Sequence, residues 1–139
     1  LAASYMKLRT VMSSYQSPYK GTSGLQRIIN ATRYSLNGFK VAFQNEAAFR
    51  QIILINCILI PLSFFTPVSF SEQALMICVC LLAIIIELIN SAIEAVVDRI
   101  SLERHELSKN AKDMGSAAQC VALSMIVSTW GTILVGHLF

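Results

Sequence analysis

The stretch that decides the fold is Ala74–Asp98, ALMICVCLLAIIIELINSAIEAVVD. Its first half carries no charge, and no Gly or Pro interrupts it, so one long helix is predicted. Four oxygen-bearing side chains follow at helical spacing: Glu87, Asn90, Glu94 and Asp98. At about 100° per residue these four fall within roughly 80° of one another. The stretch therefore predicts a lipid-compatible helix that carries one acidic stripe.

The acidic stripe indicates a functional interior rather than a lipid-facing surface. A carboxylate at bilayer depth costs at least ~2.5–3.5 kcal/mol on insertion scales, so such residues usually line a polar site. The alternative is that the helix leaves the membrane near Ile86 and that the stripe faces water, in which case its apolar faces need another cover. A group of carboxylates favours a cation, and oxygen-only ligands favour a hard ion such as Mg²⁺.

The composition is typical of an integral membrane protein with a single domain. The 139 residues are 55% hydrophobic and 14% charged, with a mean hydropathy of +0.59. All four cysteines lie in apolar runs, and we interpret them as small membrane-helix residues rather than metal ligands or disulfide partners.

Positive charge is confined to two parts of the chain. All eleven Lys and Arg residues lie within residues 7–50 and 99–112. The positive-inside rule places both segments in the cytoplasm, which requires an odd number of spans, three here. The N-terminus is then cytoplasmic and the C-terminus periplasmic. Residues 1–24 are polar and lack the apolar region of a signal peptide.

Residues 25–48 alternate an apolar face with a basic polar face. This pattern is typical of an amphipathic helix lying in the membrane interface, and the alternative is a helix packed on protein. Gly38 is a candidate break within it. The three spans are predicted at residues 49–65, 71–99 and 111–138. A capping box from Ser69 to Glu72 is predicted to start the second span, and residues 101–110 are predicted to form a charged loop.

The start of the third span combines small and charged residues. Gly115-Ser116-Ala117-Ala118 predicts close approach to a neighbouring helix. For Lys112, an ion pair with Asp98 and the binding of a phosphate are equally compatible with the spacing. Three spans are too few to enclose a polar pocket, so a homo-oligomer is predicted.

Motifs restrict the chemistry. The chain contains no GxxxxGK[ST] loop, no GxGxxG and no Ser/His/Asp constellation, so a nucleotide would need a metal on carboxylates together with Lys and Arg. Magnesium with positioning residues suffices in principle for phosphoryl transfer. A proton- or cation-coupled transporter also uses intramembrane carboxylates, but here they crowd toward one leaflet and no internal repeat is evident. An enzyme is therefore favoured over a transporter or a structural subunit.

Several motifs resemble the prokaryotic diacylglycerol kinase family. They are ELINSAIEAVVD at residues 87–98, HELS at 105–108, AKDMGSA at 111–117 and NEAAFR at 45–50. The resemblance extends from about Leu25 to the C-terminus, and MGSA at 114–117 is similar to the Gram-negative lipid kinases rather than the undecaprenol kinases, which are the alternative. It implies an all-α homotrimeric bundle in the bacterial inner membrane, with three transmembrane helices and a surface helix per chain. The implied reaction transfers the ATP γ-phosphate to diacylglycerol, giving phosphatidic acid for phospholipid recycling, with no nucleic-acid partner.

The resemblance also implies roles for individual residues. Glu87 is implied to be the catalytic base, Asn90 to belong to the same catalytic stripe, and Glu46 and Glu94 to bind Mg²⁺. The positions implied around ATP are Arg27, Tyr34, Glu46, Glu94, Glu103, His105, Lys112 and Asp113. The positions implied near the lipid are Arg27, Phe49, Arg50, Glu87 and Ser116. Depth supports the base, because Glu87 lies two turns, ~10 Å, deeper than Glu94 on one face.

Overall fold

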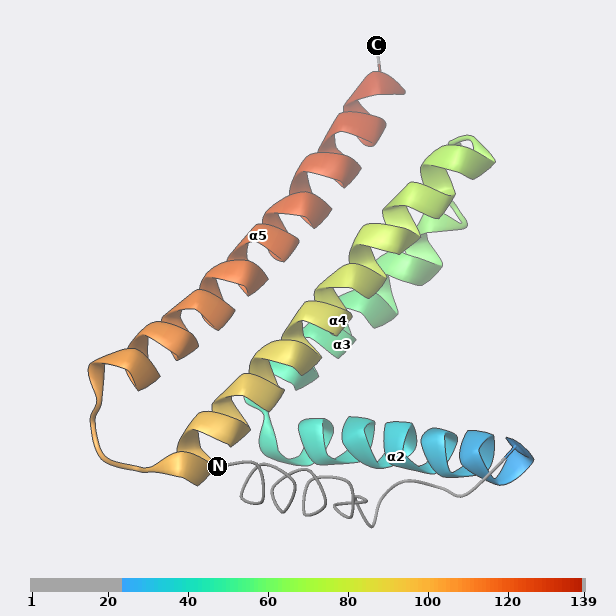
Figure 1. The fold of residues 1–139 in the computed structure, drawn as a ribbon. Helices are drawn as coiled ribbons and strands as arrows, with labels where there is room; N and C mark the ends of the chain where they lie inside the picture. Colours follow the sequence, from blue (N-terminus) through green and yellow to red (C-terminus); the bar gives the residue numbers. More distant parts are fainter. Residues whose placement is uncertain (1–23, 139) are drawn as a thin grey trace, which may run out of the picture. The chain divides into compact units, whose positions relative to one another are not determined.

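The computed structural model describes residues 24–138, and this part of the chain consists of helices and short connections without strands (Figure 1). The helices are α2 (Gly24–Asn45), α3 (Ala47–Ser63), α4 (Phe70–Ile100) and α5 (Glu106–Gly136). The all-helical prediction is therefore confirmed. The polar segment predicted over residues 1–24 lies outside the described residues, apart from Gly24.

The chain divides into two compact units, Leu1–Lys40 and Val41–Phe139. Helix α2 runs without interruption through Gly38, so the expected break at this glycine is wrong. The helix ends at Asn45, earlier than the predicted residue 48, because Glu46 adopts an extended backbone with φ −106° and ψ 114°. Its apolar side chains, such as Leu25 and Leu36, are exposed, as expected of an amphipathic surface helix.

By length and composition, the structure supports two membrane spans, or three if α2 and α3 together form one bent span. Helices α4 and α5, with 31 residues each, are long and apolar enough to cross a membrane. Helix α3 has 17 residues, about 26 Å at 1.5 Å per residue, and meets this criterion only together with α2 as one bent span. The extended Glu46 interrupts the helical run that a longer first span would need.

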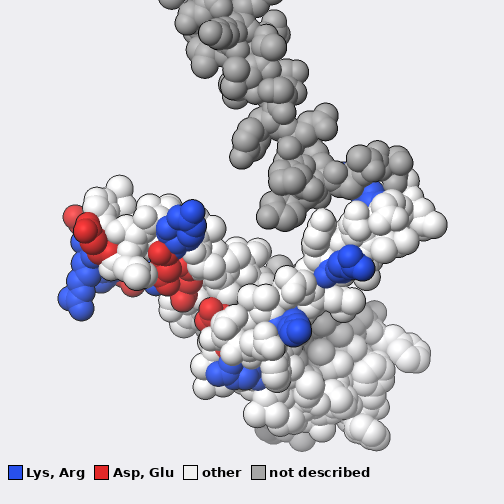
Figure 2. Space-filling view, turned by 90° about the horizontal axis from the view of Figure 1, so that it is seen from below, with Lys and Arg blue, Asp and Glu red and all other residues white. Residues whose placement is uncertain are grey.

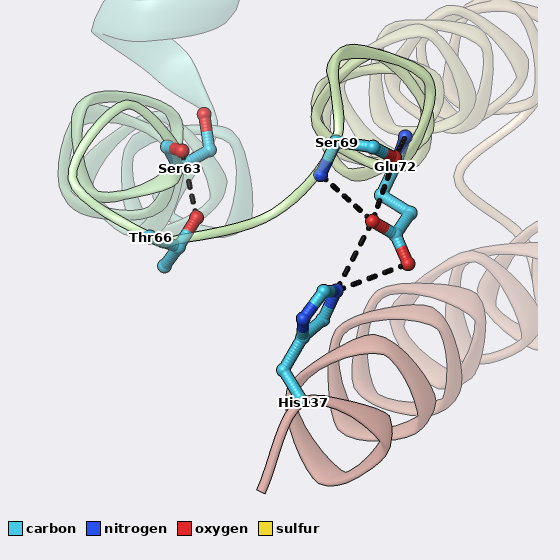
Figure 3. Close-up of polar contacts among 5 residues, drawn as sticks. All are labelled: Ser63, Thr66, Ser69, Glu72 and His137. Carbon is cyan, nitrogen blue, oxygen red and sulfur yellow. Dashed lines mark hydrogen bonds and ion pairs between the residues drawn. The ribbon is translucent and has the colours of Figure 1, made fainter.

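The predicted capping box at the start of α4 is confirmed. The Glu72 N–H donates to Ser69 Oγ at 3.3 Å, and the Ser69 N–H donates to Glu72 Oε2 at 2.8 Å. Figure 3 shows the same carboxylate also facing His137, whose Nε2 lies 3.1 Å from Glu72 Oε2. Capping satisfies backbone donors that a helix start leaves open. The contact to His137 joins the start of α4 to the end of α5.

Helix α4 is the central element of the second unit, because it packs against both α3 and α5 (Figure 1). Its buried side chains Met76, Cys80 and Ala83 form one core with residues of α5 that include Ala122 and Ile126. Trp130 belongs to the same core and donates its Nε1–H to the Met76 carbonyl oxygen at 3.3 Å. This hydrogen bond fixes the register of the two helices.

The connection between α4 and α5 is shorter than the charged loop predicted over residues 101–110. Only residues 101–105 lie outside the helices, and α5 begins at Glu106. His105 starts it, because its Nδ1 accepts the Leu107 N–H at 3.2 Å. The charged residues after Glu106 therefore belong to the first turns of α5, where water solvates them.

Candidate active site

The acidic stripe runs from a buried end to an exposed end along α4. Glu87 is 2% exposed, Asn90 and Glu94 are half-buried, and Asp98 is exposed. Glu87 also continues the buried stripe that includes Met76, Cys80 and Ala83. The alternative in which the whole stripe faces water is therefore wrong for its inner end.

Asn90 connects the stripe to α5. Its Nδ2 donates to Glu94 Oε1 at 3.2 Å, while its Oδ1 is buried without a hydrogen-bond partner among the described residues. Gly115 of α5 lies directly against this amide, since a Cβ at position 115 would overlap Asn90 Oδ1. The predicted close approach of the small-residue segment is thus confirmed at Gly115. Because Gly115 has no Cβ, the Asn90 amide fits against α5 while it donates its hydrogen bond to Glu94.

Glu46 contributes a third carboxylate from the break between α2 and α3. It occupies the N-cap position of α3, but its side chain makes no capping hydrogen bond. Glu46 and Glu94 both act electrostatically on Glu87, and both also act on Lys112. Glu46 and Glu94 are both half-buried, and both lie close enough to Glu87 to act on it electrostatically.

The residues present could hold a magnesium ion only together with ligands from a substrate. The described residues contain no group of three or more His, Cys, Asp or Glu side chains placed to hold a metal. Mg²⁺ is commonly bound by one or two carboxylates plus substrate phosphates and waters. Glu46, Glu94 and the unpartnered Asn90 Oδ1 are hard oxygen donors that fit this mode. A metal site made of protein ligands alone does not fit.

A cavity of about 570 Å³ lies where α4 ends and α5 begins. Its volume is within the range usual for small-molecule sites. Five residues singled out in the sequence line it: Asp98, Glu103, His105, Lys112 and Asp113. The fold thus brings four of the predicted nucleotide-binding residues together.

Two ion pairs engage four of the charged side chains that line this cavity. Lys112 Nζ lies 2.7 Å from Asp98 Oδ1, so of the two interpretations of Lys112 the structure has the pair. Asp113 pairs with Lys109 one turn earlier. Figure 2 shows acidic side chains lying among basic ones rather than in a separate patch. Both pairs are substantially exposed, where such pairs contribute little stability.

The residues predicted near the lipid differ in burial. Phe49 is 1% exposed and is packed inside the chain, whereas Ser116 is exposed on α5. Arg50 Nη1 donates to the carbonyl oxygens of Phe43 and Gln44, at 3.0 and 3.3 Å, and so satisfies the end of α2. The lipid roles of these residues stay predictions. The structure therefore gives Phe49 and Arg50 packing and capping contacts.

Arg27 and Tyr34 belong to the first unit, where both are exposed on α2. The sequence interpretation gave no role to two buried amides, Asn56 and Gln119, which are 3% and 9% exposed. Asn56 Nδ2 donates to the Ile52 carbonyl oxygen at 2.8 Å, whereas neither Gln119 amide atom has a hydrogen-bond partner among the described residues. An amide within an apolar span was the available signal.

Comparison with known proteins identifies related sequences. A family model described as "Prokaryotic diacylglycerol kinase" matches residues 33–134, which include the whole acidic stripe and the cavity. A protein of Pseudomonas aeruginosa named diacylglycerol kinase is 68% identical over 120 residues, covering 86% of this chain and 98% of its own length.

Two further relatives with the same name come from other bacteria. The protein of Haemophilus influenzae is 54% identical over 113 residues, covering 81% of this chain and 96% of its own length. The protein of Escherichia coli K12 is 46% identical over 116 residues, covering 84% and 95%. Since the family match covers most of the chain and the relatives match nearly end to end, this chain belongs to the prokaryotic diacylglycerol kinase family.

Proposed function

We propose that this chain is an ATP-dependent lipid kinase that phosphorylates diacylglycerol to phosphatidic acid at the cytoplasmic face of the bacterial inner membrane. The family supports the reaction. The observation that carries the mechanism is the 2% exposure of Glu87, a carboxylate that is buried while its stripe opens toward a charged cavity. A lipid hydroxyl and a nucleotide phosphate approach such a stripe from its two ends.

Glu87 is the proposed general base. Its carboxylate takes the proton of the diacylglycerol hydroxyl as the hydroxyl oxygen bonds to the γ-phosphorus of ATP. The bond between the γ-phosphorus and the bridging β–γ oxygen breaks, and ADP leaves with that oxygen. A positioned base of this kind typically contributes about 10²–10⁴-fold to the rate. The α4–α5 core excludes water, so that the Glu87 carboxylate meets the hydroxyl of the acceptor lipid rather than water.

The charged cavity is the proposed place of the nucleotide. Lys112 is held there by Asp98 and can exchange this partner for a phosphate group. His105, Glu103 and Asp113 line the same cavity and are available to the rest of the nucleotide. Glu46 and Glu94 would hold Mg²⁺, which when bound neutralises negative charge on the phosphates. Asn90 orients Glu94 through its hydrogen bond of 3.2 Å.

The assembly proposed for this activity is a homotrimer in the membrane, with the N-terminus cytoplasmic and the C-terminus periplasmic. Large apolar side chains are exposed along the spans, for example Ile85, Val121 and Val127, and lipid or other copies of the chain would cover them. The confinement of Lys and Arg to residues 7–50 and 99–112 supports the orientation.

The test is a phosphorylation assay of the purified protein in detergent with MgATP, offered diacylglycerol and undecaprenol in parallel. Phosphatidic acid is the expected product, and the Glu87→Gln variant should form it far more slowly. Preferential phosphorylation of undecaprenol would move the chain to the polyprenol kinases of the same family. Absence of transfer to either lipid by a folded protein would refute the proposal.

A further inference from the structure

Gln119 carries a buried amide for which the proposed mechanism has no use. It lies on α5 with 9% exposure, and neither its Oε1 nor its Nε2 has a hydrogen-bond partner among the described residues. Buried polar groups in folded proteins are almost always hydrogen-bonded, so an unpaired amide calls for an explanation. The level at which Gln119 lies in the bundle provides one.

The register of α4 and α5 places Gln119 opposite Glu87. The Trp130 Nε1–H donates to the Met76 carbonyl oxygen, which sets these two residues at one level. Eleven residues before Trp130 on α5 is Gln119, and eleven residues after Met76 on α4 is Glu87. The close approach of Gly115 to Asn90, one turn further along, gives the same register independently.

Glu87 and Gln119 also lie on the faces of α4 and α5 that pack against each other. Eleven residues make about three helical turns, so Gln119 continues the buried α5 stripe that contains Trp130, and Glu87 continues that of α4. These two stripes are packed together in one core. Glu87 itself accepts no hydrogen bond within the described residues. A buried amide donor without an acceptor thus lies at the level of a carboxylate residue that is 2% exposed.

We propose that Gln119 is a positioning residue whose amide N–H holds one oxygen of the Glu87 carboxylate in the substrate complex. The other oxygen is then directed at the hydroxyl of the acceptor lipid. An amide suits this place because it donates a hydrogen bond without adding charge beside the Glu87 carboxylate. The proposal rests on the proposed function, in which Glu87 is the base.

The first test compares Gln119→Met, which keeps the length of the side chain but removes the amide, with Ser124→Ala as control. Ser124 is an exposed α5 residue whose hydroxyl bonds to its own helix, at the Cys120 carbonyl oxygen. We expect Gln119→Met to lower kcat roughly 10- to 100-fold, as misplacement of a reacting group does, with KM for MgATP unchanged. Its melting temperature should stay level or rise, because an unsatisfied buried amide is removed. A joint fall of kcat and melting temperature would mean a structural role and overturn the proposal.

The second test is a double-mutant cycle with Glu87→Gln. If Gln119 acts through the Glu87 carboxylate, adding Gln119→Met to Glu87→Gln should not slow the residual reaction further. The same fold-loss in both backgrounds would show that Gln119 acts independently of Glu87 and would overturn the inference. Full activity of Glu87→Gln would instead refute the base assignment in the proposed function. Full activity of Gln119→Met beside an impaired Glu87→Gln would refute the positioning role alone.

Discussion

Replacing Gly115 with alanine should disturb the acidic stripe from the neighbouring helix. A Cβ at position 115 would overlap Asn90 Oδ1 and lie 3.2 Å from Asn90 Cγ. Either the Asn90 side chain rotates away or α4 and α5 separate locally. In the first case the hydrogen bond from Asn90 to Glu94 is lost, and in the second the packing around it loosens.

The expected magnitude follows from three terms. Overpacking of a well-packed contact typically costs ~1–3 kcal/mol, and loss of a hydrogen bond to a charged group costs ~1.5–3 kcal/mol. Alanine favours the helix over glycine by about 1 kcal/mol, which offsets part of this loss. Gly115→Ala should therefore lower the free energy of unfolding by roughly 1.5–5 kcal/mol and should lower kcat as well.

Gly131→Ala is the matched control, because it lies in the same helix and a Cβ there meets nothing within 4 Å. The assay is denaturant unfolding of both variants in the same detergent, together with phosphorylation at saturating MgATP. Gly131→Ala should be neutral or slightly stabilising. Equal stability and equal kcat of the two variants would refute the reasoning, since it would mean that the contact between Gly115 and Asn90 carries no energy.

Three further predictions concern the site and the orientation. Glu87→Gln should lower kcat by about 10²–10⁴ while an unfolding curve shows that the protein still folds; an unchanged kcat would remove Glu87 as base. Glu46→Gln or Glu94→Gln should each raise the Mg²⁺ concentration needed for half-maximal activity, and an unaltered Mg²⁺ titration in both would exclude them as ligands. Without the native cysteines, a cysteine at Ser69 should react with an impermeant thiol reagent on intact cells, but one at Lys109 only after lysis; labelling of both from one side would contradict the orientation.

The sequence predicted the helical elements well, because they depend on local patterns. An uninterrupted apolar run predicted a long helix, which the structure has as α4 at Phe70–Ile100. Spacing alone predicted the capping box of Ser69 and Glu72, since both partners lie within one turn. The charges after Glu106 obscured the start of α5, because a solvated helical turn and a charged loop have the same composition.

The common face of the acidic residues was predictable from the sequence, whereas their surroundings were not. The spacing from Glu87 to Asp98 placed the acidic residues on one face, which follows from 3.6 residues per turn. The spacing did not determine which end of that face is buried in the protein. Phe49 is 1% exposed inside the chain, and its burial could not be predicted from the sequence. An apolar side chain fits lipid and core equally well, so sequence alone does not separate the two.

What the sequence by itself determined is therefore the set of helices and the side of each that carries polar groups. Only the tertiary structure decided which groups meet, because helical periodicity contains no information on the register of a partner helix. The Trp130–Met76 hydrogen bond and the clearance at Gly115 set that register. They bury Glu87 and place the amide of Gln119 opposite it, which no spacing within either helix determines.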